Sequence, residues 1–304
     1  GSGRRTIGKN EPVDDHTLFS TGSSSKAFTS AALAMLVDEK KVHWDDRATK
    51  HLPTLKFYDE YVTREMTVRD LLSHVSGLPR YDQLWGTFNY TPEEMLQRVQ
   101  YLPPTSSFRS TYGYQNLMFV AAGEVLRAAS GKNWHEFVAS RIFQPLGMTR
   151  SNTTIAGLET RTNVATPHTR TGDRTVAIPY KNIDNVGPAG SITSSVREMS
   201  EWLRLQLGSG VHNGRRLLSD SVVREMHSPQ NLIPRSARAD SINPYSHFST
   251  YGLAWFVEDH RGRKIVQHGG NIDGMTAMVA MMPGERVGFV LLENLNASGM
   301  RTPI

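Results

Sequence analysis

The sequence predicts an α+β fold in which helices pack against one antiparallel sheet. Two observations lead to this prediction: helical periodicity dominates the middle of the chain, and strand patterns crowd residues 251–292. The segments between these strands are too short for crossover helices, so neighbouring strands should run antiparallel. The chain has 304 residues, of which 38% are hydrophobic, and no internal repeat, so it can bury a sizeable core as one compact unit.

The first predicted helix begins beside Ser23. Small and apolar residues recur at helical spacing after it, namely Ala27, Phe28, Ala31, Ala32, Met35 and Leu36. Ser23 therefore stands at the helix entrance, and Lys26 follows one turn later on the same face. A serine hydroxyl becomes a nucleophile when a base removes its proton, and a lysine with a lowered pKa can be that base. The competing interpretation is a helix-capping serine beside a solvated lysine.

Further helices are predicted in the middle of the chain. Each candidate is bounded by Gly, Pro or a polar cap, and the ranges are 67–74, 92–99, 115–129, 134–143 and 197–207. Between residues 147 and 190 the periodicity is lost. A segment of this length without periodicity predicts an irregular region that lines a site or is mobile.

Four strands are predicted near the end of the chain, at 251–257, 264–267, 275–282 and 287–292. They are short and rich in Val, Met, Phe and Ile. Turn residues separate them, namely Arg261-Gly262, Gly269-Gly270 and Pro283-Gly284. These strands should form an antiparallel meander.

Composition excludes several classes of function. The chain has no cysteine, so disulfides and thiolate catalysis are excluded and any nucleophile must be oxygen or nitrogen. The net charge is +5, but Arg and Lys are scattered, which argues against nucleic-acid binding. The histidines lack metal-ligand spacing, so no metal is expected. No apolar run is long enough for a membrane span and no signal peptide is visible, so localisation and oligomeric state stay open.

Three stretches are similar, in order, to segments of the serine β-lactamase and penicillin-binding-protein superfamily, particularly its class C-like branch of esterases, D-amino-acid peptidases and transesterases. They are 18–29 around Ser23 and Lys26, 67–79, which ends in Ser-Gly-Leu-Pro, and 143–148, which reads Phe-Gln-Pro-Leu-Gly-Met. The similarity extends over most of the chain. Several independent motifs in the same order make a chance match far rarer than a single motif does. The resemblance implies a β-lactamase/transpeptidase-like fold. Its sheet domain would comprise residues 1–45 and 185–304, and its inserted, mostly helical domain residues 46–184.

The resemblance also implies a second catalytic element, Tyr-x-Asn, for which the chain offers two candidates. We choose Tyr114-Gln115-Asn116 because an amphipathic helix follows it directly, whereas Tyr180-Lys181-Asn182 lies in irregular chain. In the family this tyrosine shares a proton with the lysine and protonates the leaving group, while the asparagine amide binds the substrate carbonyl. Because a phenol beside an ammonium is stabilised as phenolate, we expect the pKa values of Lys26 and Tyr114 to move towards the range useful for proton transfer.

The third element is Gln267-His268-Gly269-Gly270-Asn271. Glycines allow a substrate backbone to approach the strand, where main-chain N–H groups can bind an oxyanion. The family has Lys-Thr-Gly or His-x-Gly at this place. The resemblance therefore assigns His268 to the catalytic set, Gly269 and Gly270 to substrate binding, and the N–H groups of Ser23 and Asn271 to an oxyanion hole. Since histidine removes a permanent cation, we expect simple esters to be better substrates than penicillins, which carry a carboxylate.

The resemblance implies a serine hydrolase that needs no cofactor, forms an acyl-enzyme on Ser23 and cleaves a small-molecule ester, amide or peptide. The alternatives are a D-Ala carboxypeptidase or β-lactamase acting on penicillin-like substrates and, from another class, a non-catalytic scaffold or binding protein that retains the fold. A Ser-His-Asp triad through His74 and Asp70 is disfavoured because the chain has no Gly-x-Ser-x-Gly elbow. Family members, which are often periplasmic or secreted, have two earlier strands and a later helix, so we expect uncovered sheet edges here.

Overall fold

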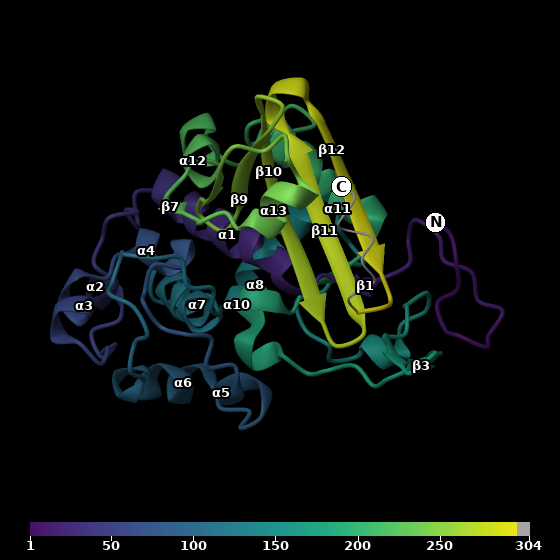
Figure 1. The fold of residues 1–304 in the computed structure, drawn as a ribbon, viewed down its shortest axis with the longest axis horizontal. Helices are drawn as coiled ribbons and strands as arrows, with labels where there is room; N and C mark the ends of the chain where they lie inside the picture. Colours follow the sequence, from purple (N-terminus) through teal and green to yellow (C-terminus); the bar gives the residue numbers. More distant parts are fainter. Residues whose placement is uncertain (297–304) are drawn as a thin grey trace.

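The computed structural model describes residues 1–296 and contains a six-stranded sheet (Figure 1). Its strand order is β12-β11-β10-β9-β8-β7 with antiparallel neighbours throughout, so the predicted meander and the α+β class are confirmed. The strands are β7 (Asn231–Leu232), β8 (Ser249–Tyr251), β9 (Phe256–His260), β10 (Arg263–Ile272), β11 (Met275–Met282) and β12 (Val287–Glu293). Three separate strand pairs are β1 (Phe19–Ser20) with β4 (Thr193–Ser194), β2 (His168–Thr171) with β3 (Arg174–Ala177), and β5 (Val211–His212) with β6 (Arg215–Arg216).

The single strand predicted at 251–257 is wrong. β8 ends at Tyr251 and β9 begins at Phe256, and between them the N–H of Gly252 donates to the carbonyl of Trp255 at 2.7 Å. Ala254 in this turn has a φ of 68°, which ends an extended strand. The residues of the turn are buried in the core, and a buried apolar turn has the same hydrophobic pattern as a buried strand.

The turn predicted at Gly269-Gly270 is also wrong. β10 continues through both glycines to Ile272, and Gly270 pairs with Ala277 of β11. A Cβ atom on Gly270 would lie 1.9 Å from the carbonyl oxygen of Thr21. The glycine therefore marks a close approach of another backbone to the strand rather than a reversal of the chain.

Five helices lie close to their predicted ranges: α1 (Lys26–Asp38), α4 (Val68–Ser73), α6 (Pro92–Arg98), α7 (Leu117–Ser130) and α11 (Val196–Leu207). The helix predicted at 134–143 is α-helical only in α8 (Trp134–Val138) and continues as a π-helical turn before α9 (Gln144–Leu146). The other helices are α2 (Ala48–His51), α3 (Glu60–Glu65), α5 (Gln83–Gly86), α10 (Gly187–Gly190), α12 (Asp220–Met226) and α13 (Ala237–Ile242). The region 147–190, for which the sequence predicts no regular structure, does contain two regular elements, the β2–β3 hairpin and α10.

Capping explains where α4 begins and what Asp70 does. The Thr67 side chain accepts from the Asp70 N–H, and the Asp70 carboxylate accepts from the Thr67 N–H in return. Arg109 also donates to Asp70, at 2.6 Å. His74 ends α4 in the left-handed conformation. Asp70 is thus engaged in holding the helix and a neighbouring loop, which gives the Ser-His-Asp alternative no support.

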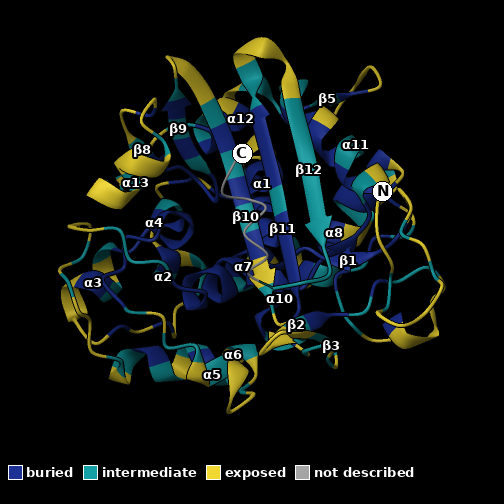
Figure 2. Cartoon of the chain, turned by 45° about the vertical axis from the view of Figure 1, so that its right-hand side comes forward, coloured by how far each residue is buried: buried dark blue, intermediate teal, exposed yellow. Residues whose placement is uncertain are grey.

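Helix α1 lies at the centre of the fold and positions the site. Phe28 of α1 stacks on Trp202 of α11 with ring centroids 3.9 Å apart. Both belong to the same hydrophobic core as Val266 and Val279 of the sheet. The two helices therefore cover one face of the sheet (Figure 1), and β11 is largely buried (Figure 2). Because α1 also packs against α7, its first residues lie where the sheet meets the helices of the middle segment.

Within residues 1–296 we find no helix that is both long and apolar enough to cross a membrane.

Candidate active site

Ser23 and Lys26 lie side by side at the start of α1. Ser23 belongs to a 3-10 turn, η1 (Gly22–Ser25), and Lys26 is the first residue of α1. The Lys26 Nζ atom lies 3.1 Å from Ser23 Oγ, within hydrogen-bond distance. Lys26 is fully buried, so the interpretation as a solvated helix lysine is wrong. The two side chains have the geometry of a hydroxyl nucleophile and its base.

Two further acceptors hold the Lys26 amine in place. Nζ donates to Asn116 Oδ1 at 2.7 Å and to the carbonyl oxygen of Ala189 at 2.9 Å. Asn116 directly precedes α7, and Ala189 lies in α10. The amine thus ties three separate elements together, and this fixes its position beside Ser23.

Burial separates the proton affinities of the lysine and the tyrosine. Burial lowers the pKa of Lys26 well below 10.5, the positive charge of Arg80 lowers it further, and Asp82 opposes this. Burial raises the pKa of Tyr114 to about 12, although a hydrogen bond with Ser23 acts in the other direction. The expected phenolate at Tyr114 is therefore wrong, because its anion would be desolvated. The neutral Lys26 amine is the group suited to take the proton from Ser23.

The pH dependence of hydrolysis should report the Lys26 amine. At low pH this amine carries a proton and cannot accept one from Ser23, whereas raising the pH through its lowered pKa produces the base. We expect kcat/KM for p-nitrophenyl butyrate, measured after subtraction of spontaneous hydrolysis, to rise with pH through a pKa well below 10.5. Activity should then stay level, because Tyr114 keeps its proton to about 12. A rate that rises only near pH 10.5 would contradict the role of a buried amine.

The structure brings Tyr114, and not Tyr180, to the nucleophile. Tyr114 makes a side-chain hydrogen bond with Ser23, and Lys26 Nζ lies 4.9 Å from the centroid of the Tyr114 ring. Tyr180 instead donates its hydroxyl to the carbonyl of Ala165 and packs against a small separate core cluster. The geometry supports the choice of Tyr114-Gln115-Asn116 over the rival motif.

Strand β10 passes directly beside the nucleophile. The Ser24 hydroxyl donates to the carbonyl of His268 at 3.0 Å, which ties η1 to the strand. A Cβ atom on Gly22 would lie 2.9 Å from the main-chain nitrogen of Asn271. The main chain of Asn271 therefore lies next to Ser23, where an N–H group can meet a developing oxyanion.

Gly270→Ala should push β10 away from the nucleophile. The added Cβ would meet the carbonyl of Thr21, a backbone atom that no side-chain rotation can move. We expect a loss of about 1–3 kcal/mol in the free energy of unfolding and a lower kcat/KM for esters. Urea unfolding followed by circular dichroism measures the first and an ester assay the second. Gly284→Ala is the matched control, because a Cβ there has no neighbour within 4 Å; equal effects of the two substitutions would contradict the close approach.

His268 lies within the site but is turned towards its own strand and Tyr251. The residue is 1% exposed. Its Nε2 lies 2.9 Å from the Tyr251 hydroxyl and its Nδ1 lies 2.6 Å from the carbonyl oxygen of Gly269. Because a carbonyl oxygen only accepts, Nδ1 carries the hydrogen in a neutral ring, and Nε2 then accepts from Tyr251. These bonds suit a group that holds the strand in position.

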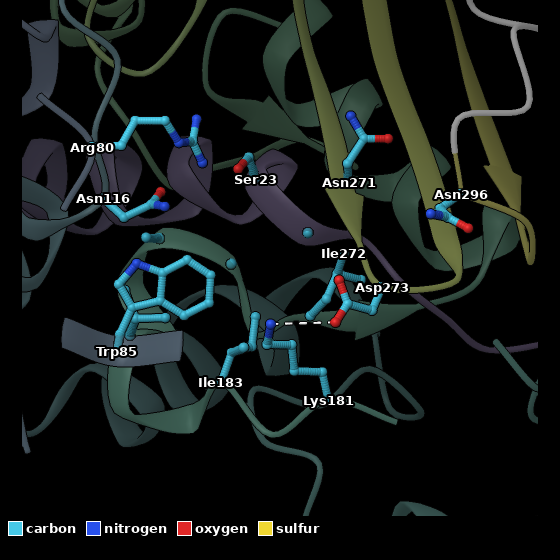
Figure 3. A pocket seen from close by; sticks show the side chains of 14 residues that line it. Ser23, Arg80, Trp85, Asn116, Lys181, Ile183, Asn271, Ile272, Asp273 and Asn296 are labelled. Carbon is cyan, nitrogen blue, oxygen red and sulfur yellow. Dashed lines mark ion pairs between the residues drawn. The ribbon is translucent and has the colours of Figure 1, made fainter. Parts of the chain in front are cut away.

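Two hollows open beside Ser23. The first, of about 340 Å³, is bordered by Trp85, Asn116 and Lys181 among others (Figure 3). The second, of about 380 Å³, is bordered by residues that include Tyr114, His268 and Gly269. Ser23, Arg80 and Asn271 border both hollows. A substrate with its carbonyl at Ser23 therefore has room on both sides.

Arg80 and Asp82 also belong to the site, although neither was predicted from the sequence. The Asp82 carboxylate accepts three hydrogen bonds, from Arg80 Nε at 2.6 Å, from Trp85 Nε1 at 2.9 Å and from Asn116 Nδ2 at 3.1 Å. Since Asn116 Oδ1 is bound on its other side by the lysine, Asp82 fixes the orientation of the Asn116 amide. The sequence does contain a signal for this pair, because two opposite charges stand within the three residues that follow the Ser-Gly-Leu-Pro stretch.

The chain is similar to known proteins over nearly its whole length. The family model described as "Beta-lactamase" matches residues 1–303. The unguisins hydrolase ungD' of Aspergillus campestris is 29% identical over 303 residues, which cover 95% of this chain and 54% of that protein. Penicillin-binding protein 4 of Amycolatopsis lactamdurans is 25% identical, over 93% of this chain and 73% of that protein. The chain spans about half the length of the unguisins hydrolases that it matches.

Solved structures share the fold. The octameric penicillin-binding protein homologue from Pyrococcus abyssi superposes with a TM-score of 0.81 at 24% identity, covering 97% of this chain and 66% of that one. The D-amino acid amidase from Ochrobactrum anthropi SV3 gives a TM-score of 0.79 at 22% identity, covering 97% of this chain and 81% of that one. The β-lactamase/transpeptidase-like fold expected from the sequence is confirmed.

Proposed function

The chain belongs to the beta-lactamase family, and on this basis we propose that it is a serine hydrolase that forms an acyl-enzyme on Ser23 and cleaves a small-molecule ester, amide or peptide. One observation carries the proposal: a fully buried lysine amine lies 3.1 Å from the Ser23 hydroxyl. For a lysine with only a structural role, burial costs desolvation free energy and brings no benefit. A general base, in contrast, needs the lowered pKa that burial produces.

In the first half of the reaction the acyl group moves to the protein. The Ser23 proton passes to Lys26 as the bond forms between Ser23 Oγ and the substrate carbonyl carbon. The carbonyl oxygen becomes an anion, which the N–H groups of Ser23 and Asn271 stabilise. The bond from carbon to the leaving nitrogen or oxygen then breaks, Tyr114 protonates the leaving group, and Lys26 returns its proton to Tyr114.

In the second half, water replaces the leaving group. Lys26 accepts a proton from the water as the water oxygen attacks the acyl carbon. The bond from that carbon to Ser23 Oγ then breaks, Lys26 returns the proton to Oγ, and the carboxylic acid departs. Asn116 and Gly269 bind the substrate beside the reacting carbonyl, whereas Gly270, expected from the sequence to do the same, packs against the Thr21 carbonyl and keeps the strand close to Ser23. His268 supports this strand through its bonds to Tyr251 and Gly269. No step requires a cofactor.

We also propose that residues 1–45 and 185–304 form one domain and residues 46–184 a second, inserted one. The sheet and α1 come from the outer segments, and the helices α2 to α9 come from the middle segment. Under this division Ser23 and His268 belong to one domain and Tyr114 to the other. The substrate would then bind where the two domains meet.

A fluorophosphonate probe tests the proposed function, because only an activated serine reacts with it. We expect one covalent adduct per chain, located by peptide mass spectrometry on the peptide that contains Ser23, and competition by p-nitrophenyl butyrate. No adduct, together with no ester hydrolysis, would instead favour a scaffold or binding protein that retains the fold. A D-Ala carboxypeptidase or β-lactamase remains the second candidate, supported by the similarity to penicillin-binding protein 4, and would also turn over nitrocefin on the same preparation.

A further inference from the structure

An ion pair borders the first hollow on the side opposite Ser23. Lys181 Nζ lies 3.3 Å from the Asp273 carboxylate, and both residues border this hollow. Figure 3 shows the pair across the hollow from Ser23. Lys181 precedes α10 in the chain, whereas Asp273 lies in the turn between β10 and β11. The pair therefore joins two segments that are distant in the sequence.

The turn that carries Asp273 is fixed by the backbone next to it. The His168 N–H donates to the carbonyl of Gly274 at 3.0 Å. A Cβ atom on Gly274 would lie only 2.4 Å from the Cβ atom of Pro167, so the turn packs tightly on this segment. Asp273 is thus presented from a backbone that is held in place.

The segment that carries Lys181 is held on the same support. The Ile178 N–H donates to the carbonyl of Pro167 at 2.9 Å, and the Tyr180 hydroxyl donates to the carbonyl of Ala165. The partners of the ion pair therefore stand on one backbone segment. Because that segment fixes both main chains, only side-chain entropy is lost when the two charges meet.

These contacts give the second Tyr-x-Asn motif a place in the site. Tyr180 anchors the segment and Lys181 reaches the hollow, while Asn182 Oδ1 accepts from the Asp184 N–H at 2.9 Å and shapes the following turn. Ile183, the next residue, borders the hollow as well. The motif thus builds one wall of the hollow without supplying a group to the proton transfers.

The walls between Ser23 and the ion pair are largely apolar. Large apolar side chains border the hollow, namely Trp85, Ile183, Val186 and Ile272. The Trp85 indole N–H donates to Asp82 at 2.9 Å, which fixes the orientation of the ring. Lys181 Nζ lies 5.5 Å from the centroid of this ring. An apolar group bound here would lose its contact with water, which favours binding.

The acyl part of the substrate should occupy this hollow. Tyr114, the proposed proton donor to the leaving group, borders the second hollow, so the leaving group belongs there and the acyl part extends to the other side of Ser23. The first hollow has a volume of about 340 Å³. A cavity of about 150 Å³ holds one benzene molecule, so the space suits a short chain or a single ring.

We propose that the Lys181–Asp273 ion pair limits the length of the acyl group, so that the substrates are esters or amides of short-chain or single-ring acids. The inference rests on the proposed function and narrows its substrate class. A longer chain has to separate the two charges, because the pair lies in its path. The side chains of Lys181 and Asp273 are 33% and 61% exposed, so separating them costs little. Long acyl groups should therefore be disfavoured by a modest factor rather than excluded.

Two p-nitrophenyl esters test this limit, the butyrate and the octanoate. They share a leaving group, so changes in the second hollow cancel in the ratio of their kcat/KM values, octanoate over butyrate. We expect this ratio to rise about fivefold, equivalent to about 1 kcal/mol, in Lys181→Ala and in Asp273→Ala. The double variant should show no more than the larger single effect, because either substitution opens the same gap. Exchanging the charges, Lys181→Asp with Asp273→Lys, should return the ratio towards the wild-type value.

Arg263→Ala is the matched control, because Arg263 forms an exposed ion pair with Glu285 at 2.9 Å and borders neither hollow. Its ratio should equal that of the wild type. Sodium chloride at about 1 M should raise the ratio more in the wild type than in Lys181→Ala, because salt screens the pair.

The outcomes distinguish this inference from the function on which it rests. An unchanged ratio in both Lys181→Ala and Asp273→Ala, with both esters turned over, overturns the inference alone. A double variant whose effect is the product of the two single effects also overturns it, since the two residues would then act separately. No turnover of either ester and no fluorophosphonate adduct on Ser23 would overturn the proposed function.

Discussion

Ser23→Ala is expected to abolish hydrolysis of p-nitrophenyl butyrate and covalent labelling by a fluorophosphonate. The proposed acyl-enzyme cannot form without Oγ, and removal of a catalytic serine typically costs about 10⁴–10⁶ in kcat. The side chain of Ser23 lies at the edge of the two hollows, so its loss should leave the core intact. Circular dichroism and urea unfolding establish that the variant is folded, and the ester assay and labelling gel measure the effect.

Ser25→Ala is the control for this experiment. Ser25 lies in the same turn as Ser23, but its hydroxyl accepts from the Ile192 N–H at 3.0 Å and is buried. Its removal should cost about 1 kcal/mol of stability, while Ser23 in this variant is still labelled. A fluorophosphonate adduct on another serine of the Ser23→Ala protein would show that the nucleophile was assigned to the wrong residue.

Tyr114→Phe is expected to lower kcat by about two to four orders of magnitude, the usual contribution of a general acid or base. The substitution removes only the hydroxyl, which in the proposed mechanism passes a proton between Lys26 and the leaving group. Stopped-flow or steady-state hydrolysis of an alkyl ester, which needs protonation of its leaving group, is the suitable measurement. An activated aryl ester should be affected less, since its leaving group departs without help.

Tyr180→Phe provides the comparison for this tyrosine. The Tyr180 hydroxyl binds the carbonyl of Ala165, so its loss should reduce stability by about 1 kcal/mol and leave turnover largely unchanged. A greater loss of turnover in Tyr180→Phe than in Tyr114→Phe would mean that the second Tyr-x-Asn motif is the functional one.

The parts of the fold that the sequence predicts correctly are those governed by local periodicity. β11 and the helices α1, α7 and α11 have long, regular apolar patterns, and their ends lie within a few residues of the predictions. The errors at Gly252 and Gly270 have another origin. Both glycines accommodate backbone from distant parts of the chain, namely the carbonyl of Met226 in one case and that of Thr21 in the other, and no local pattern contains this information.

In the candidate site, too, the residues predicted from the sequence are those in local motifs, and the residues missed depend on long-range folding. Ser23 and Lys26 form a local motif, and Asn116 was found through a short motif beside a helix. The network around Asp82 was not found, because it depends on a loop that folds back so that one carboxylate meets three donors from separate positions. The direction of the Tyr114 pKa was missed for a related reason: the proximity of a cation was foreseen, but the complete burial of both groups was not.

The nucleophile and the strand beside it also lie far apart along the chain. The hydrogen bond from Ser24 to His268 spans 244 positions, and the β1–β4 pair also joins distant segments, with Phe19 opposite Ser194. Contacts of such long range are slow to form, because much chain entropy is lost before they become favourable. During synthesis Ser23 leaves the ribosome well before its neighbours on β10, which follow about 244 positions later. A chain synthesised only as far as α11 therefore has a Ser23 without its neighbours on β10 and should be inactive. The return of hydrolysis in a refolding experiment would report when the last long-range contacts form, rather than when the first helices form.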